Sequence, residues 1–280
     1  MTVDRFAGTQ PTDGRAGDAG RWADVMRGMS CRTDPVHLHS IARQLGVVRI
    51  TLERLKHPGR VSWDGAKPAI AIRADMSPER RRFTLAHELA HVLLLHGCPQ
   101  GTDGQPTPAQ MRDEERLCDA IAGSVLLPAG DVLPLVTTPT LELAHVRAVA
   151  ADHQVSMSLV VSRLGDFDRR THMLIRLESF EGRWVATRII GRNRGLSSNL
   201  RIPPEYAGPV DGLSRLDQHV VLDVLIGGLG YNITGTGNKW GATALLLATG
   251  IRRAPALDNA CDGDGSAQAS STPNADHAGR

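Results

Sequence analysis

The sequence predicts an α+β protein, and three patterns support this fold class. Segments rich in β-branched residues, VVRITLERL (47–55), GRVSW (59–63) and PAIAIRA (68–74), indicate a small sheet. Two long stretches then carry apolar residues at helical spacing, and the first of them is RRRFTLAHELAHVLLLH. Strand patterns return after Asp168, so we expect a second region of mixed α/β character there.

Four segments are expected along the 280 residues. Residues 1–33, rich in small and polar residues, are expected to form a disordered N-terminal lead-in. Residues 34–168 would form the first domain, and residues 169–253 a C-terminal α/β domain. The tail, 254–280, has the same composition as the lead-in and is also expected to be disordered.

End signals mark the helices of the first domain. Asp34-Pro35 is an N-cap signal, and Gly46 is a stop signal for the helix that follows. Ser77-Pro78-Glu79 supplies a cap, a first-turn proline and an acid for a helix that stops at Gly97. The expected helices are 36–45, 78–97, 109–127, 141–151 and 156–165.

The C-terminal region carries weaker signals. HMLIRLESF and RWVATRIIG flank Glu181-Gly182, which predicts a β-hairpin. We expect a helix from Leu216 to Ile226, and the glycine-rich stretch after Gly227 indicates no particular structure.

Composition narrows the classes of function. A formal net charge of +2 gives no reason to expect a nucleic-acid or membrane-surface binder. The 4 cysteines form no CxxC pair, which favours a reducing compartment over a disulfide framework. The first residues lack the apolar run of a signal peptide. The sequence also contains no run of 18 apolar residues, the length that would be needed to span a membrane. We therefore expect a cytoplasmic protein.

The segment HELAH (87–91) is an H-E-x-x-H motif. Residues four apart lie on one face of a helix, so His87 and His91 can bind one metal ion. Glu88 lies beside that stripe, where its carboxylate can take a proton from a metal-bound water. The apolar neighbours indicate a buried helix, in which these polar groups need partners. We assign both histidines as metal ligands and Glu88 as the catalytic base.

A catalytic zinc site has three protein ligands and one open position, so a third ligand must come from elsewhere. Glu115 and Asp119 are four apart on the second long helix and share a face. We assign Glu115 as the third ligand and Asp119 as the acceptor of the free N–H of a metal-bound histidine. The expected ion is Zn²⁺, with Mn²⁺ or another divalent ion as alternatives, and no other cofactor is expected.

Three residues are alternative ligands. His96 does not fit the longer motif H-E-x-x-H-x-x-G-x-x-H, since the chain has leucine at 94 and glycine at 97. Glu114 has no acidic partner four residues further on. Cys118 could bind zinc as a thiolate, or it could be a small buried apolar residue.

Two segments resemble the zinc metallopeptidases of the anti-repressor and radiation-response type, the ImmA/IrrE-like family. They are RRRFTLAHELAHVLLLH (80–96) and ERLCDAIAGSVLLP (115–128), the second against a family pattern of roughly E-x-E-A-N-x-F-A-A-x-L-L-M-P. The match places Glu115 at the family's ligand position and Asp119 at its Asn/Asp position. The resemblance extends over about 34–164 and departs from the pattern at Leu117, Cys118 and Ile121.

This resemblance implies a zincin-like metalloprotease domain. It implies a cytoplasmic endopeptidase that cleaves a protein substrate, a helix-turn-helix transcriptional repressor, and so switches on gene expression in a stress response. No membrane partner is implied. Family members often carry a different C-terminal domain, so a sensor-like role is an expectation for residues 169–253.

A helix-turn-helix-like pattern over 141–165 raises an alternative function, a DNA-binding transcriptional regulator with a structural metal site. Its second helix offers only Arg163 as a base, so direct nucleic-acid binding is not the favoured hypothesis. The run Arg80-Arg81-Arg82 fits a solvated face, or alternatively a contact for an acidic substrate segment. His145 and His153 are candidates for stabilising an oxyanion, and the sequence does not choose between them.

Overall fold

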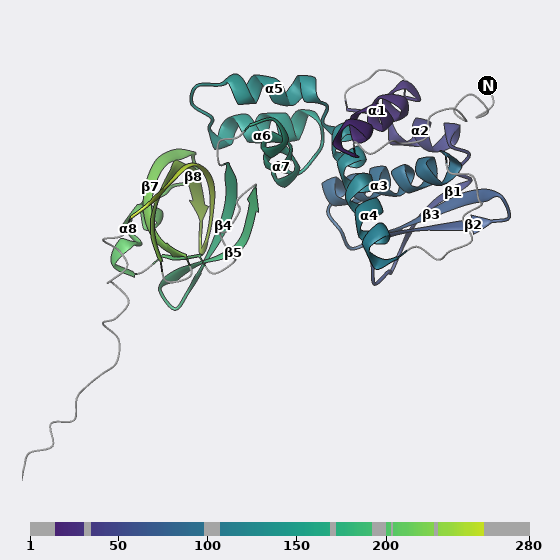
Figure 1. Cartoon of the computed structure of the whole chain (residues 1–280). Helices are drawn as coiled ribbons and strands as arrows, with labels where there is room; N and C mark the ends of the chain where they lie inside the picture. Colours follow the sequence, from purple (N-terminus) through teal and green to yellow (C-terminus); the bar gives the residue numbers. More distant parts are fainter. Residues whose placement is uncertain are drawn as a thin grey trace, which may run out of the picture.

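The computed structural model describes residues 15–30, 35–97, 107–168, 172–191, 200–202, 204–226 and 229–254. Helices packed on a small sheet form the N-terminal part, and a closed barrel of strands forms the C-terminal part (Figure 1). The α+β class holds for the whole. The prediction of an α/β fold for the C-terminal region is wrong, because the strands β4 to β9 form a closed barrel there.

Helix α1 (Arg15–Gly28) lies where the composition indicates a disordered lead-in. Ala19, Ala23 and Met26 are buried along one face, and the helix packs against α4 (Pro108–Leu126). The expectation of disorder fails for these residues because a narrow stripe of small apolar side chains is sufficient when another helix covers it.

The predicted small sheet is present. It consists of β1 (Arg49–Glu53), β2 (Gly59–Asp64) and β3 (Lys67–Arg73), in the order β1-β3-β2. β1 runs parallel to β3, and β2 runs antiparallel to it. The central strand β3 has five consecutive buried residues, which fits a strand covered on both faces. The short helix α2 (Leu38–Gln44) precedes the sheet.

Two long helices carry the motif residues, as predicted. α3 (Pro78–Gly97) packs against β2, β3 and α4. At its start the Ser77 hydroxyl accepts a hydrogen bond from the Arg80 amide at 3.3 Å. α4 begins with a capping box, in which Thr107 and Gln110 bond each other's backbone amides. Both caps fix where the helices begin, and therefore which side chains face each other.

Three shorter helices follow: α5 (Ala129–Thr137), α6 (Leu143–Asp152) and α7 (Met157–Phe167). The last two correspond to predicted helices, whereas α5 was not predicted. Pro128 ends α4 and is also the N-cap of α5, since proline is compatible with the start of a helix. Among the described residues, no single helix is long and apolar enough to cross a bilayer. Only α4 and α5 together reach that criterion, across a bend of 79°.

The barrel closes in the order β4-β5-β6-β7-β8-β9. The predicted hairpin joins β4 (Met173–Phe180) to β5 (Arg183–Gly191), and Glu181 and Gly182 adopt φ of 51° and 77° at its turn. The helix expected from Leu216 to Ile226 is wrong: Gln218–Ile226 forms β7, with alternating burial at Val220, Leu222 and Val224. The remaining elements are β6 (Leu200–Ile202), a 3₁₀ turn (Pro204–Tyr206), α8 (Gly208–Asp211), β8 (Leu229–Trp240) and β9 (Thr243–Arg253).

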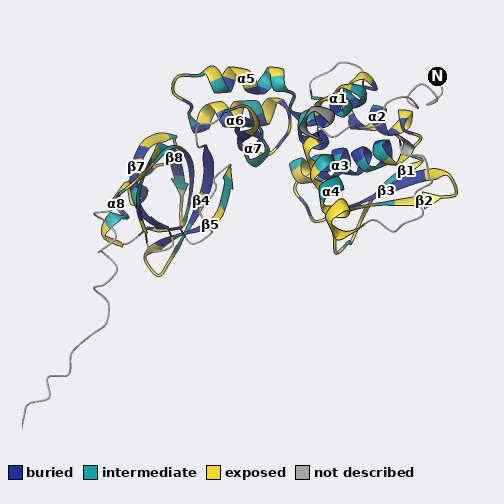
Figure 2. Cartoon of the chain, viewed as in Figure 1, coloured by how far each residue is buried: buried dark blue, intermediate teal, exposed yellow. Residues whose placement is uncertain are grey.

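Two apolar clusters form the core, as the buried segments in Figure 2 indicate. One fills the inside of the barrel. The other fills the helical part and also includes Leu174, Leu245 and Leu247 of β4 and β9. The outer wall of the barrel is therefore part of the core of the N-terminal half.

Candidate metal centre

Helix α3 places His87 and His91 one turn apart on the same face. Their ring centroids are 4.8 Å apart, and the two Nε2 atoms are 3.1 Å apart. Both side chains are largely buried, with 14% and 16% of their surfaces exposed. The i, i+4 spacing that predicted a shared face therefore brings both ring nitrogens to one point.

Helix α4 brings the third predicted ligand to the same point. Glu115 Oε2 lies 3.2 Å from His87 Nε2, and Glu115 Oε1 lies 3.4 Å from His91 Nε2. One ligand atom from each of the three residues can be chosen so that all lie within 4.8 Å of one another. Two nitrogens and one carboxylate are a donor set suited to zinc and to other divalent ions.

The outward-facing nitrogens of both imidazoles meet carboxylates. Asp119 Oδ1 lies 2.8 Å from His87 Nδ1, the contact expected for Asp119. Glu114 Oε1 lies 3.2 Å from His91 Nδ1, a role that the sequence argument missed. A signal for it existed: each of two metal-binding histidines needs an acceptor for its second nitrogen, and Asp119 can serve only one.

The hydrogen bonds from the two Nδ1 atoms to Asp119 and Glu114 indicate whether the site suits a cation. An Nδ1–H that donates to a carboxylate leaves the lone pair of Nε2 pointing to the other side of the ring. Two such lone pairs then face each other and the Glu115 carboxylate across little more than 3 Å. Groups that all carry negative charge or lone pairs repel at this separation unless a cation lies between them. The site fits a divalent ion.

The pKa values of Glu88 and His87 are both raised, but for different reasons. Burial raises the pKa of Glu88, although the imidazoles of His87 and His91 oppose this shift. Burial alone would lower the pKa of His87, but the hydrogen bond and charge of Asp119 outweigh it, so the pKa is raised. A carboxyl group with a raised pKa is better matched to proton transfer near neutral pH.

A cleft of about 420 Å³ opens onto the site. Gly59, at the start of β2, lies so close to Glu88 that a Cβ there would overlap the Glu88 carboxylate and the Thr84 methyl group. Nothing in the local sequence indicates this, because the contact joins a strand to a helix. The cleft is lined by His57, Pro58, Gly59, Arg80, Phe83, Thr84, His87, Glu88, His91, Glu115 and Asp119. Five of these residues were not predicted from the sequence: His57, Pro58, Gly59, Phe83 and Thr84.

Of the alternative candidates, Glu114 lies at the site, on the outer nitrogen of His91, whereas Cys118, His145 and His153 do not line the cleft. Cys118 is fully buried, burial raises the pKa of its thiol, and it does not line the cleft. Neither histidine named as an oxyanion candidate lines the cleft: His145 Nδ1 accepts the Glu142 amide, and His153 pairs with Asp131. His57 does line it. The side chain of His96 lies outside the described part of the structure.

A small sheet packed on an H-E-x-x-H helix, with a carboxylate from the next helix facing the motif histidines, is consistent with a zincin-like fold. Comparison with known proteins agrees. Residues 41–165 match the model of the peptidase M78 family, described as the IrrE N-terminal-like domain. Over that segment, a little under half of the chain, the sequence is similar to the IrrE-like family.

A curated relative is the radiation response metalloprotease IrrE of Deinococcus deserti, 37% identical over 79 residues. The match covers 27% of this chain and 28% of that relative. Among solved structures, a Mycobacterium tuberculosis transcriptional regulator is similar over 85% of this chain and 77% of its own, with a TM-score of 0.47 and 12% identity. A likeness at that level bears on neither fold nor function.

Proposed function

We propose that the chain is a zinc-dependent endopeptidase that cleaves a protein substrate. One observation carries this proposal: His87 Nε2, His91 Nε2 and the Glu115 carboxylate converge on one point beside the buried carboxylate of Glu88. The match of residues 41–165 to the model of a peptidase family supports it. Manganese or another divalent ion fits the same donor atoms.

Each residue has a definite task in peptide hydrolysis. His87, His91 and Glu115 would hold a divalent ion, which would supply Lewis acidity toward the scissile carbonyl and the attacking water. Asp119 and Glu114 fix the orientation of the two imidazoles.

Glu88 takes a proton at its carboxylate and returns it to the leaving amine. Its buried position and raised pKa suit both halves of this transfer, because the group must be a base first and an acid afterwards. Gly59 leaves room for the carboxylate at the cleft wall.

We further propose that the substrate is a folded helix-turn-helix repressor, cut at one or a few sites, so that cleavage switches on genes. The resemblance to anti-repressor peptidases supports this substrate class. Arg80 lines the cleft, which favours an acidic residue near the scissile bond. The α5–α7 helices and the barrel give the catalytic region additional surface for positioning one partner.

The test is to incubate zinc-loaded protein with purified candidate repressors from the same genome, and separately with casein. Wild type should cut one repressor at a defined bond, whereas Glu88→Gln should retain zinc and lose cleavage by about two to four orders of magnitude. Cleavage that persists in Glu88→Gln would overturn the mechanism. Equal cleavage of casein and every repressor would overturn the substrate class.

The alternative, a DNA-binding regulator, has less support. In α7, Val160, Val161 and Leu164 are buried in the helical core. Arg163, the base that could have read DNA, donates to the Leu127 carbonyl at 3.2 Å and pairs with Asp166 at 2.6 Å. A helix with its apolar face buried and its arginine already bonded within the chain is poorly placed to enter a groove of DNA.

A further inference from the structure

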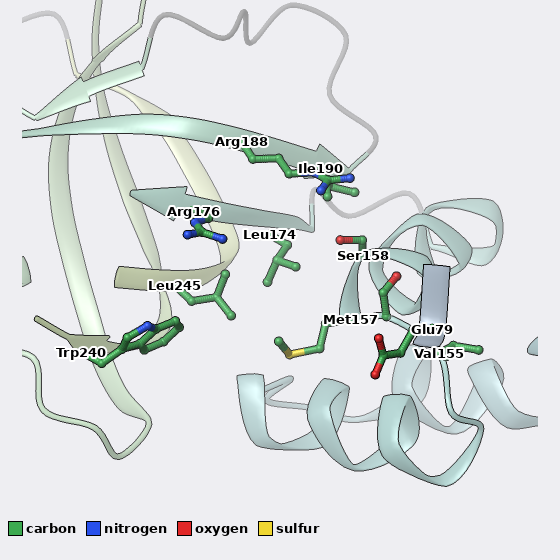
Figure 3. A pocket seen from close by; sticks show the side chains of 11 residues that line it. Glu79, Val155, Met157, Ser158, Leu174, Arg176, Arg188, Ile190, Trp240 and Leu245 are labelled. Carbon is green, nitrogen blue, oxygen red and sulfur yellow. The ribbon is translucent and has the colours of Figure 1, made fainter. Parts of the chain in front are cut away.

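A second cavity, of about 400 Å³, lies between the barrel and the helical part (Figure 3). The strands of the barrel contribute Arg176, Arg188 and Trp240 to its wall. Glu79 of α3 and the residues around the start of α7 form the opposite side. None of its lining residues belongs to the metal centre, and its volume is in the range of small-molecule sites.

Much of the wall is apolar. Leu174 and Leu245 of the barrel are nearly buried, and Met157 and Ile190 continue the apolar surface on either side. Trp240 also lines the cavity and remains 46% exposed, which is unusual for such a large ring. An apolar or aromatic body in the cavity would cover this surface.

Two positive charges stand next to each other on the barrel wall. Arg176 and Arg188 are directly opposite in the β4–β5 register, and both are exposed. Like charges in such cross-strand positions are destabilising. Glu178 Oε1 lies 3.0 Å from Arg176 and offsets one of the two charges, so the pair keeps a net positive charge. A β-bulge follows directly after Arg176, an irregularity that is common beside binding sites.

The other walls determine how a ligand would be oriented. The start of α7, an 11-residue helix capped by Ser156, adds positive potential at Met157 and Ser158. Glu79 lies across the cavity from the arginines (Figure 3). An anionic group would therefore face the arginine pair, and a neutral or hydrogen-bond-donating end would face Glu79.

We propose that this cavity is a binding site for a small organic anion, one carboxylate or phosphate group on an apolar or aromatic body. Arg176 and Arg188 bind the anionic group, and Leu174, Leu245 and Trp240 cover the body. The site is independent of the metal centre and does not rest on peptidase activity.

The probe is 8-anilino-1-naphthalenesulfonate, an anion on an aromatic body, titrated into the full-length zinc-loaded protein and followed by fluorescence. We expect one site per chain. Binding should weaken about five- to tenfold in Arg176→Gln and in Arg188→Gln, since each removes a charge-assisted contact at a partly solvated site. Arg183→Gln is the matched control: Arg183 is also exposed on β5 but does not line the cavity.

Three comparisons make the test decisive. N-phenyl-1-naphthylamine has the same body without the anion and should bind much more weakly. Decanoate and phenyl phosphate compete as carboxylate and phosphate sources, and displacement by either supports the site and identifies the preferred group. Trp240→Ala, at an exposed position, should also weaken binding. Equal affinity of wild type and both arginine variants, equal binding of the neutral probe, or displacement by neither competitor would each overturn the proposal.

Discussion

Glu88 is an acid buried in the wall of the cleft, with 7% of its surface exposed. Burial disfavours its charged form, so the pKa of the carboxyl group is raised in the folded chain. The group that would accept the proton in catalysis is therefore also a source of instability. Such conflicts between function and stability are expected at active sites.

Glu88→Gln should raise the stability of the metal-free protein at pH 7, by roughly 1 kcal/mol, because it removes a buried charge while keeping the shape of the side chain. A raised folded-state pKa means that the wild-type group favours the folded state at low pH and loses that advantage as pH rises through the raised pKa. The gain from Gln should therefore shrink as pH falls into the carboxyl range. Thermal unfolding with chelator present, at several pH values, measures it.

Glu205→Gln serves as the control, because Glu205 is exposed and the substitution should change nothing. If Glu88→Gln were less stable than wild type at neutral pH, the assignment of an unfavourable buried charge would be wrong.

Gly59 is a second residue whose importance lies in contact with Glu88. Gly59→Ala should push the Glu88 carboxylate and the Thr84 methyl group aside. We expect a loss of roughly 1–3 kcal/mol of stability, typical of overpacking, and a large loss of repressor cleavage with zinc content retained. Thermal unfolding measures the stability, zinc analysis the metal content, and the repressor assay the cleavage rate. Gly130→Ala, where a Cβ meets nothing within 4 Å, should leave zinc content and cleavage unchanged.

At the scale of elements, α4 supplies three carboxylates to the site of α3. Glu115 faces the Nε2 atoms of the two histidines, while Asp119 and Glu114 contact their Nδ1 atoms. The capping box at Thr107 fixes the start of α4, and so the rotation at which these acids face α3.

Alanine substitution should separate these roles. Glu115→Ala should strip the metal, and Asp119→Ala and Glu114→Ala should each weaken metal affinity by about 10- to 100-fold, the usual effect of losing a partner of a ligating histidine. The sequence alone predicts that Glu114→Ala has little effect on metal affinity, whereas the contact of Glu114 with His91 predicts a loss, so this variant distinguishes the two expectations. Competition with a chelator measures affinity, and Asp113→Ala is the control on the same helix. Full affinity in Glu114→Ala would show that its contact with His91 is incidental.

Elements with local signals could be predicted from the sequence, and those made by distant contacts could not. The cap at Ser77 and the H-E-x-x-H spacing depend on adjacent residues, so α3 and the shared face of His87 and His91 could be predicted from the sequence. Barrel closure depends on pairing β4 with β9, and so on residues about 70 positions apart along the chain. The close approach of Gly59 to Glu88 and the packing of α1 against α4 also depend on residues that are far apart in the sequence.

At the scale of the whole molecule, the helical part and the barrel share one apolar cluster. Leu247, on β9, is fully buried in the cluster of the helical part. We therefore expect the two parts to unfold together rather than as separate domains.

Leu247→Ala should lower the free energy of unfolding by about 2–5 kcal/mol, the range for a buried leucine, and should move one common transition in calorimetry. Leu229→Ala is the control, since Leu229 is 45% exposed on β8. Two separate transitions, of which only one responds to Leu247→Ala, would contradict a shared core.

Helix α3 also forms a wall common to the two cavities. Glu79 lines the cavity at the barrel, and Arg80, the next residue, already lines the metal cleft. His87 lies about 12 Å beyond Glu79 along the helix axis, at 1.5 Å per residue. One residue inserted between Glu79 and His87 would rotate everything beyond it by about 100° relative to the first turn. The number of residues in this stretch is therefore constrained, because an insertion or a deletion would misalign one cavity or the other.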